Sequence, residues 1–274
     1  MAEQEDLEQG GAEMTFTEHI VELRRLLVRA AILFGLVAII FFMMKGVVVD
    51  WVFAPMSPDF PTNRFFDWLA GITDVDALRI NQTTVELYNN KMAGQFSLHI
   101  RSSVIGALVV TFPYIIYQLW SFVKPALSDV VRSQTKRIVW EVSMWFFIGF
   151  FFGYYCISPL AANFLIGYEV SPTVQNIIDV SSYMSTVMGV SFAAALIFQL
   201  PLLVRLLSSI GLMKAEFMRK YRKVAAAVLL VLSAIITPPD VFSQVLIFIP
   251  LYLLYEYGIT IAVKIEKRKA EQEE

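Results

Sequence analysis

The sequence predicts an all-α membrane protein with six transmembrane helices, several of them kinked, that form a curved wall with both termini in the cytoplasm. Three observations predict this class. Hydrophobic residues make up 57% of the 274 residues, and the mean hydropathy of +0.61 is too high for a soluble domain. Apolar runs recur at lengths suited to membrane helices. Lysine and arginine gather on alternate connections between these runs.

Six apolar runs are candidate spans. Five have 19 to 25 residues, and one has only 13. In chain order they are Leu26–Met44, Val104–Val123, Val142–Ile166, Val180–Val204, Val224–Ile236 and Val241–Val263. The 13-residue run would be about 20 Å long as a helix, against about 30 Å of hydrocarbon. It therefore needs a thinner bilayer, snorkelling flanks or a partner that covers it.

Four of the runs contain proline, at Pro113, Pro159, Pro201 and Pro250. Each proline removes a backbone donor and tends to kink its helix. Kinked helices with short connections predict a curved wall rather than a tight bundle. The alternative is that membrane helices simply tolerate these prolines.

The orientation follows from the basic residues. Seventeen lysines and arginines lie on one side: on the N-terminal flank, in the second-to-third and fourth-to-fifth connections, and in the C-terminal tail. Five lie on the other side, all in the long first loop from Lys45 to Ser102. Because cytoplasmic loops are enriched in basic residues, both termini should be cytoplasmic.

The two tails, the net charge and the single cysteine narrow the possible classes of protein. We expect a disordered acidic tail at residues 1–14, one transmembrane domain at 15–264 and a charged tail at 265–274. The acidic N-terminus lacks the basic region of a secretion signal. The net charge of −2 gives no sign of nucleic-acid binding. The single cysteine, Cys156, cannot form an internal disulfide, and no metal or cofactor is expected.

Three polar residues in or beside the spans are candidate functional groups. Gln199 lies deep in the fourth span, although it could simply bond a neighbouring helix. Glu256 lies inside the sixth, although it could reach the cytoplasmic interface by snorkelling. Asp240 lies in the turn between the fifth and sixth spans, where it could merely cap the sixth helix.

The segment before the first span carries the most specific pattern. Thr15 and Glu18 form a capping box, which predicts a helix starting there. On that helix Glu18, Glu22, Arg25 and Arg29 fall on one face. Glu22 either pairs with Arg25 three residues on or receives a cationic ligand from outside the chain.

Four segments resemble the TatC family, the large subunit of the twin-arginine translocase, in the family's order. They are residues 18–26, EHIVELRRL; residues 113–127, PYIIYQLWSFVKPAL; residues 237–244, TPPDVFSQ; and the stretch from Pro250 through Leu254-Tyr255-Glu256. The resemblance runs from about Thr15 to Val263.

This resemblance implies a non-enzymatic receptor in the cytoplasmic (inner) membrane. It would bind signal peptides with consecutive arginines and act in an oligomeric complex with single-span TatA and TatB partners. The proton-motive force would then drive folded cargo across. The implied peptide site comprises Glu22, Arg24, Phe122 and Asp129, and the implied partner-helix site comprises Thr237 and Gln244. Asp240 matches the family's acid in the outer turn.

Two positions depart from the family pattern. A glutamate usually follows Pro-Ala-Leu, but Val131 stands there, so Asp129 would have to substitute or is an ordinary loop aspartate. Gln199 stands where many members have glutamate, which puts a titrating group at that position in doubt.

Other classes fit less well. A secondary transporter of a small solute, the main alternative, would be expected to show repeats and broken helices around a midplane site. A channel needs a polar pore lining, and a hydrolase needs a nucleophile and base at membrane depth. His19 and His99 lie outside the spans, and no Gly-x-Ser-x-Gly occurs.

Overall fold

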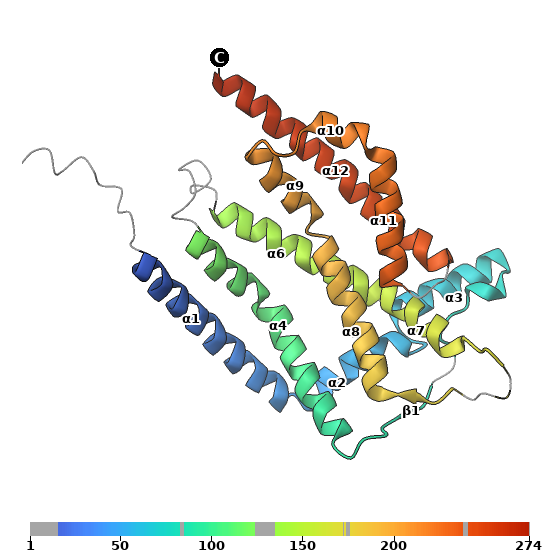
Figure 1. Cartoon of the computed structure of the whole chain (residues 1–274). Coiled ribbons are helices and arrows are strands. Elements are labelled where there is room, and N and C mark those ends of the chain that lie inside the picture. The colour runs from blue at the N-terminus through green and yellow to red at the C-terminus, as the bar shows by residue number, and fades with distance from the viewer. Residues whose placement is uncertain are drawn as a thin grey trace, which may run out of the picture.

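The structure is a computed structural model, and it describes residues 16–82, 85–123, 135–171, 173, 176–237 and 241–273. Nearly all of these residues are helical (Figure 1). Five helical stretches are long and apolar enough to cross a membrane: Ile20–Met43, Gly94–Phe122, Arg137–Gly167, Val180–Ser209 and Ser243–Glu271. Each of them overlaps one of the six predicted runs, and the remaining run, Val224–Ile236, corresponds to a shorter helix.

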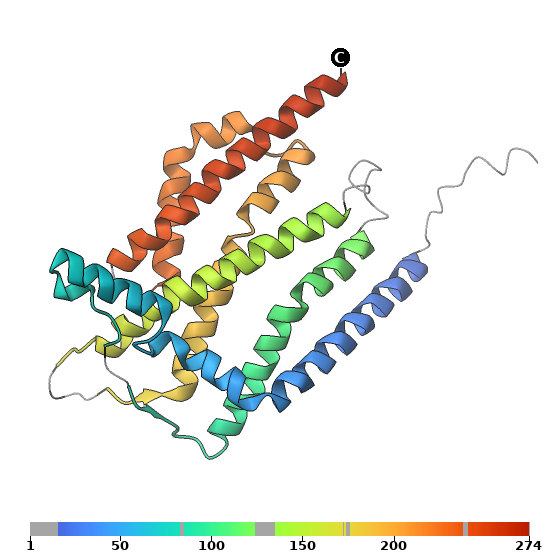
Figure 2. The same cartoon turned by 180° about the vertical axis from the view of Figure 1, so that it is seen from behind.

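The first two spans form an antiparallel pair at one edge of the molecule. Helix α1 (Phe16–Met43) lies along α4 (Gly94–Val123), as Figures 1 and 2 show. A Cβ atom at Gly106 of α4 would stand 2.7 Å from the Phe41 ring, so the missing side chain permits this close approach. The other faces of α1 are exposed, and they present leucine and isoleucine as a lipid-facing helix does.

The molecule has two ends, which we call the terminal end and the loop end. At the terminal end α1 begins, α4 ends, α6 begins and α12 ends (Figure 1). At the loop end lie α2 (Lys45–Phe53), η1 (Ala54–Met56), α3 (Pro61–Thr73), η2 (Asp76–Leu78) and the strand β1 (Leu87–Tyr88). β1 pairs in parallel with β2 (Ile178–Asp179), in a register that places Leu87 beside Ile178.

The third span crosses the fourth very closely. Helix α6 (Thr135–Phe152) passes through a π-helical segment, η4 (Gly153–Ile157), into α7 (Ser158–Gly167). A Cβ at Gly149 would lie 2.6 Å from the Phe198 Cβ, and one at Gly153 would lie 2.6 Å from the Ser191 Cα. These two glycines, four residues apart, let the backbones of α6 and α8 (Val180–Ile197) approach each other.

Two of the four prolines lie directly after an interruption of their span, and two lie inside helices that continue through them. Pro201 is in the first turn of α9 (Leu200–Ser209), directly after a break at Phe198 and Gln199, so the fourth span is two helices. Pro159 follows the π-helical segment. Pro113 and Pro250 lie inside α4 and α12. The kinked, curved architecture is therefore confirmed.

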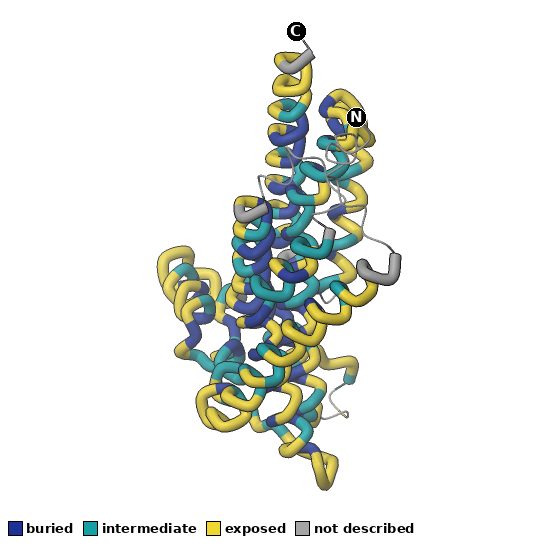
Figure 3. Tube along the Cα trace, turned by 90° about the vertical axis from the view of Figure 1, so that its left-hand side faces the viewer, coloured by how far each residue is buried: buried dark blue, intermediate teal, exposed yellow. Residues whose placement is uncertain are grey.

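The last helices form a hairpin beside α9. The short α10 (Ala215–Lys220) leads into α11 (Arg222–Ile236), which corresponds to the predicted 13-residue run. Its 15 residues give a length of about 22 Å, less than the hydrocarbon thickness. Helix α12 (Val241–Glu273) packs against α9 and α11 and continues through most of the predicted charged tail. Figure 3 shows the buried residues concentrated along the central helices.

The first loop, which the sequence pattern left largely unassigned, is held in place by asparagines. The buried Asn63 donates from Nδ2 to the carbonyls of Pro55 (3.0 Å) and Ser57 (2.7 Å). Asn81 donates to the Asn63 Oδ1 (3.1 Å) and to the carbonyl of Pro159 (3.0 Å). Amide side chains thus join the loop to α7 and satisfy backbone groups that would otherwise be buried without partners.

We predict that Asn63→Ala lowers the free energy of unfolding by about 1–3 kcal/mol, because it removes three hydrogen bonds of a buried side chain and takes the Asn63 donor from the Pro55 carbonyl. Thermal unfolding of the detergent-solubilised protein measures this. Asn90→Ala is the matched control, since Asn90 is exposed. Equal unfolding temperatures for both variants would show that the asparagines do not hold the loop.

Candidate functional site

The most distinctive polar group lies at the terminal end of the α1–α4 pair. Glu22 is in the second turn of α1, and its side chain is half-buried. Its Oε2 is buried and makes no hydrogen bond within the described residues. The alternative pairing with Arg25 is not formed, because the ion pairs of the described residues do not include Glu22. A buried carboxylate oxygen without a donor is costly, so this group favours a donor from outside the described residues.

The interface between α1 and α4 that begins next to Glu22 is largely apolar. A small cavity of about 30 Å³ beside it lies between α1 and α4 and is lined by Leu23, Leu26, Leu27, Ala30, Ile115, Gln118, Leu119 and Phe122. We call this interface between α1 and α4 the α1–α4 seam. Phe122, which the resemblance implies as a peptide-site residue, lines the same cavity as Leu23, the residue after Glu22.

The other predicted peptide-site residues are placed differently. Arg24 is exposed, and at two residues from Glu22 its side chain leaves the helix on the opposite face. Asp129 and Val131 lie outside the described residues. The structure thus brings Glu22 and Phe122 to one end of one helix pair and separates Arg24 from Glu22.

One residue at this end was not predicted as a site residue. The indole Nε1 of Trp120, near the end of α4, is buried and has no hydrogen-bond partner within the described residues. Trp120 was noted only as part of a motif. Its orphaned donor is a property of the tertiary structure, since the sequence alone does not show which indole will be buried.

Gln199 lies at the break between α8 and α9. Its Nε2 lies within hydrogen-bonding distance of the carbonyls of Val142 (3.3 Å) and Ala195 (3.4 Å). Its Oε1 is buried without a partner. The interhelical bond from α9 to α6 is the alternative that the sequence analysis left open for this residue.

Glu256 is neutralised by an arginine. Its carboxylate accepts a hydrogen bond from Arg222, the first residue of α11, at 2.8 Å, and from the Tyr252 hydroxyl at 3.2 Å. Because α11 is short, its first residue lies level with the middle of α12. Glu256 is therefore part of an ion pair that joins two helices, and 31% of its side chain is exposed.

Thr237 and Gln244 both bond the backbone of α11. The Thr237 hydroxyl donates to the Ser233 carbonyl (2.7 Å) and is buried. The Gln244 Nε2 donates from α12 to the Leu230 carbonyl (3.1 Å). Beside them, α11 exposes an apolar stripe, which we call the α11 stripe: Val224, Val228, Val231 and Ile235. Asp240, in the turn between, lies outside the described residues.

Sequence reasoning missed the ion pairs that join the third and fourth spans. Glu141 on α6 pairs with Arg137 one turn earlier, at 3.0 Å, and through its other oxygen with Arg205 on α9. The four-residue spacing of Arg137 and Glu141 is a recognisable helix pattern. The link to Arg205, 64 residues away, depends on how the spans cross.

We predict that Glu141→Gln destabilises the protein by about 1–3 kcal/mol, because it leaves the partly buried Arg205 guanidinium without its counter-charge. Glu216→Gln is the control, since Glu216 is exposed and is expected to change stability by less than about 0.5 kcal/mol. Thermal unfolding in detergent compares the two. A loss no larger than that of the control would mean that the ion pair is weak.

These features define the class as a multi-pass helical membrane protein. Its polar groups form ion pairs and interhelical bonds. The described residues contain no cluster of three or more side chains suited to a metal ion.

The sequence matches the family described as Sec-independent protein translocase protein (TatC) over residues 18–250. A TatC protein of Blattabacterium sp. subsp. Periplaneta americana is 35% identical over 260 residues, which are 94% of this chain and 98% of the relative. TatCy of Bacillus subtilis is 29% identical, over 95% and 92% of the two chains. A crystal structure described as the twin-arginine translocase receptor TatC superposes with a TM-score of 0.64 at 27% identity, covering 91% of this chain and 100% of that one.

The chain belongs to the TatC family of Sec-independent protein translocase subunits. It is therefore a translocase component and not an enzyme, and it acts in a complex with other Tat subunits. The broken fourth span is a feature that the small-solute transporter alternative also expects, but family membership favours protein translocation over that alternative.

Proposed function

We propose that this protein is the signal-peptide receptor and core subunit of a twin-arginine translocase. It would recognise consecutive arginines of a signal peptide and export folded proteins across the cytoplasmic membrane, driven by the proton-motive force. The observation that carries the receptor role is the buried Oε2 of Glu22 at the terminal end, which makes no hydrogen bond within the described residues. A guanidinium supplies several donors in a planar fork, which suits a carboxylate that lacks a partner.

A comparison with other carboxylates supports Glu22 as the group that receives the arginine. Glu141, Glu256 and Glu266 all lie in or beside the spans, and each accepts a hydrogen bond from within the chain. The Glu22 Oε2 has no such bond among the described residues. Asp129 is the proposed second carboxylate of the site, in place of the family glutamate absent at Val131.

We predict that Glu22→Gln weakens the binding of a peptide with two consecutive arginines by roughly 10- to 100-fold, because one charge-assisted hydrogen bond contributes about 1.5–3 kcal/mol. Fluorescence anisotropy of a labelled peptide, titrated with the purified protein, measures this. Glu216→Gln removes the same charge elsewhere and should leave the affinity unchanged.

The same titration has two further arms. A peptide with both arginines changed to lysine should bind more weakly, because an ammonium cannot form the bidentate pair. Asp129→Asn tests the second carboxylate. If Glu22→Gln and the lysine peptide both bind as tightly as the parents, Glu22 is not the arginine acceptor. Export of a folded twin-arginine reporter, in a strain lacking its own TatC, tests the translocase role separately.

The proposed orientation has both termini in the cytoplasm, in an inner membrane. The support is the 17 basic residues on the side of the termini against five on the other. Under this orientation the terminal end is cytoplasmic, as a receptor for newly made cargo requires, and α11 is a sixth span through a thinned bilayer.

We predict that a cysteine at Glu216 is labelled only from the cytoplasmic side and a cysteine at Asn90 only from the opposite side, in a Cys156→Ser background. Both positions are exposed, at opposite ends of the molecule. Labelling of intact cells with a membrane-impermeant maleimide distinguishes them. Labelling of Glu216→Cys in intact cells would show that the protein has the opposite orientation in the membrane.

The proposed partners are TatA- and TatB-type single-span proteins, in an oligomeric complex. The α11 stripe supports this proposal, because a short helix with an exposed apolar face offers room for a partner helix beside Thr237 and Gln244. A photo-crosslinker at Ile235 should capture such a partner, and one at Tyr88, on the loop-end strand, should not.

Gln199 carries no titrating group, so a proton-coupled step in this chain would use another residue. Asp240 and Glu256 are proposed as accessory polar groups.

A further inference from the structure

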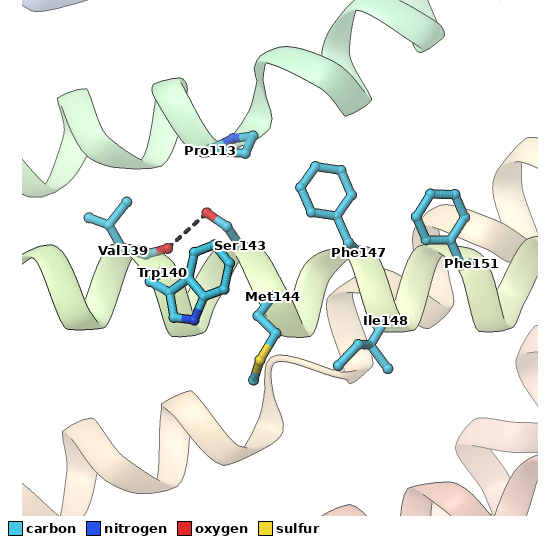
Figure 4. Close-up of a pocket in the computed structure, with 8 residues that line it drawn as sticks. All are labelled: Pro113, Val139, Trp140, Ser143, Met144, Phe147, Ile148 and Phe151. Atoms are coloured by element: carbon cyan, nitrogen blue, oxygen red, sulfur yellow. Dashed lines mark hydrogen bonds between the residues drawn. The ribbon is translucent and has the colours of Figure 1, made fainter.

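An apolar groove of about 740 Å³ runs along α6 beside the kink of α4. We call it the α6 groove. Its wall is formed by Pro113 of α4 and by Trp140, Met144, Phe147, Ile148 and Phe151 of α6. Figure 4 shows Phe147 and Phe151 directed toward α4, and Met144 and Ile148 directed toward the opposite edge of α6. Ser143, the polar residue of the wall, has its hydroxyl bonded to the Val139 carbonyl (2.8 Å).

We propose that the α6 groove binds an acyl chain of an anionic phospholipid whose headgroup is held by Arg137. This site is separate from the α1–α4 seam and goes beyond the receptor function. It uses the side of α6 that is not packed on α8. Under the proposed orientation the lipid would belong to the cytoplasmic leaflet, but the class of lipid does not depend on the orientation.

The length of the groove suits one chain in one leaflet. From Val139 to Phe151 the wall follows 12 residues of helix, about 18 Å. One leaflet contributes half of the hydrocarbon thickness, about 15 Å. An acyl chain lying along α6 would therefore occupy the groove over its full length and end near Phe151.

The terminal end of the groove carries excess positive charge. Arg137 lies one turn before Trp140, so the two side chains are neighbours on the helix surface. Arg137 and Arg205 share the single carboxylate of Glu141, which leaves one positive charge uncompensated among the described residues. Arg268 lies close enough to Arg205 to repel it electrostatically. Basic pockets between membrane helices are typical sites for anionic headgroups.

Arg137 also has free hydrogen-bonding capacity. Within the described residues its side chain bonds only through Nε, to Glu141, and 60% of its surface is exposed. Its two terminal nitrogens can form the paired bonds to phosphate oxygens that guanidiniums favour. Trp140, 69% exposed at the groove mouth, is a residue enriched at the level of lipid headgroups.

The shape of the wall disfavours a helix as the occupant. Helices that pair in membranes approach through small residues such as glycine. The two glycines of this span, Gly149 of α6 and Gly153 of η4, already face α8, and Ser143 is the one small residue among those that line the groove. The groove side instead presents tryptophan, phenylalanine and methionine, which suit a thin, flexible chain better than a rod about 10 Å wide.

Bromine-labelled lipids test the proposal, because a brominated acyl chain quenches a tryptophan that it touches. Delipidated protein in detergent is titrated with brominated phosphatidylglycerol or brominated phosphatidylcholine. Subtracting the signal of Trp140→Phe isolates Trp140 from the other four tryptophans. We expect Trp140 quenching at about fivefold lower concentrations of the anionic lipid, since one basic residue near an anionic headgroup contributes about that factor.

Variants locate the headgroup. Arg137→Gln should abolish the preference for phosphatidylglycerol, and Arg64→Gln, which removes an exposed arginine at the loop end, should retain it. Equal quenching by both lipids in the unaltered protein would overturn the headgroup assignment, even if Arg137→Gln fails to fold. An absence of Trp140 quenching, or a crosslinker at Trp140 that captures a second copy or a partner helix in membranes, would overturn the lipid site altogether.

Discussion

The close crossing of α6 over α8 is the contact on which the rest of the structure depends. Gly149 and Gly153 bring the two backbones together, and no larger side chain fits at either position without a shift of α8. In a bilayer the hydrophobic effect does not hold helices together, so close van der Waals contact and interhelical bonds must do so. The crossing sets Gln199 against the Val142 carbonyl and Arg205 against Glu141.

The same crossing determines which surfaces remain free. Because the small residues of α6 face α8, its bulky residues line the α6 groove on another side. The π-helical segment that begins at Gly153 and the break before Pro201 bend the two spans while they stay in contact. The backbone groups freed by such bends must find partners within the protein, since lipid offers none. The bond from the Ser158 hydroxyl to the Gly153 carbonyl (2.9 Å) is one such partner.

Of four glutamates in or beside the spans, three have partners within the described residues. Glu141 and Glu256 are paired with arginines, and Glu266 accepts from the Ala215 amide. Each pair joins two different helices and so stabilises the arrangement of the terminal end. Glu22 is the exception, with a buried oxygen that no donor from the described chain reaches. A buried carboxylate oxygen that lacks a donor is typical of a ligand site, where the missing donor belongs to the ligand.

The amino-acid sequence by itself determined the class, the spans and the short fifth helix, because these depend on the length and apolarity of local runs. It also singled out Glu22, through a pattern of charges on one turn of helix. The tertiary structure alone decided which polar groups are partnered. It placed Arg222 beside Glu256 and Arg205 beside Glu141, and it used Asn63 and Asn81 to order the first loop. Those contacts join residues 18 to 64 positions apart, so no local periodicity encodes them. They follow from the angles at which kinked helices cross.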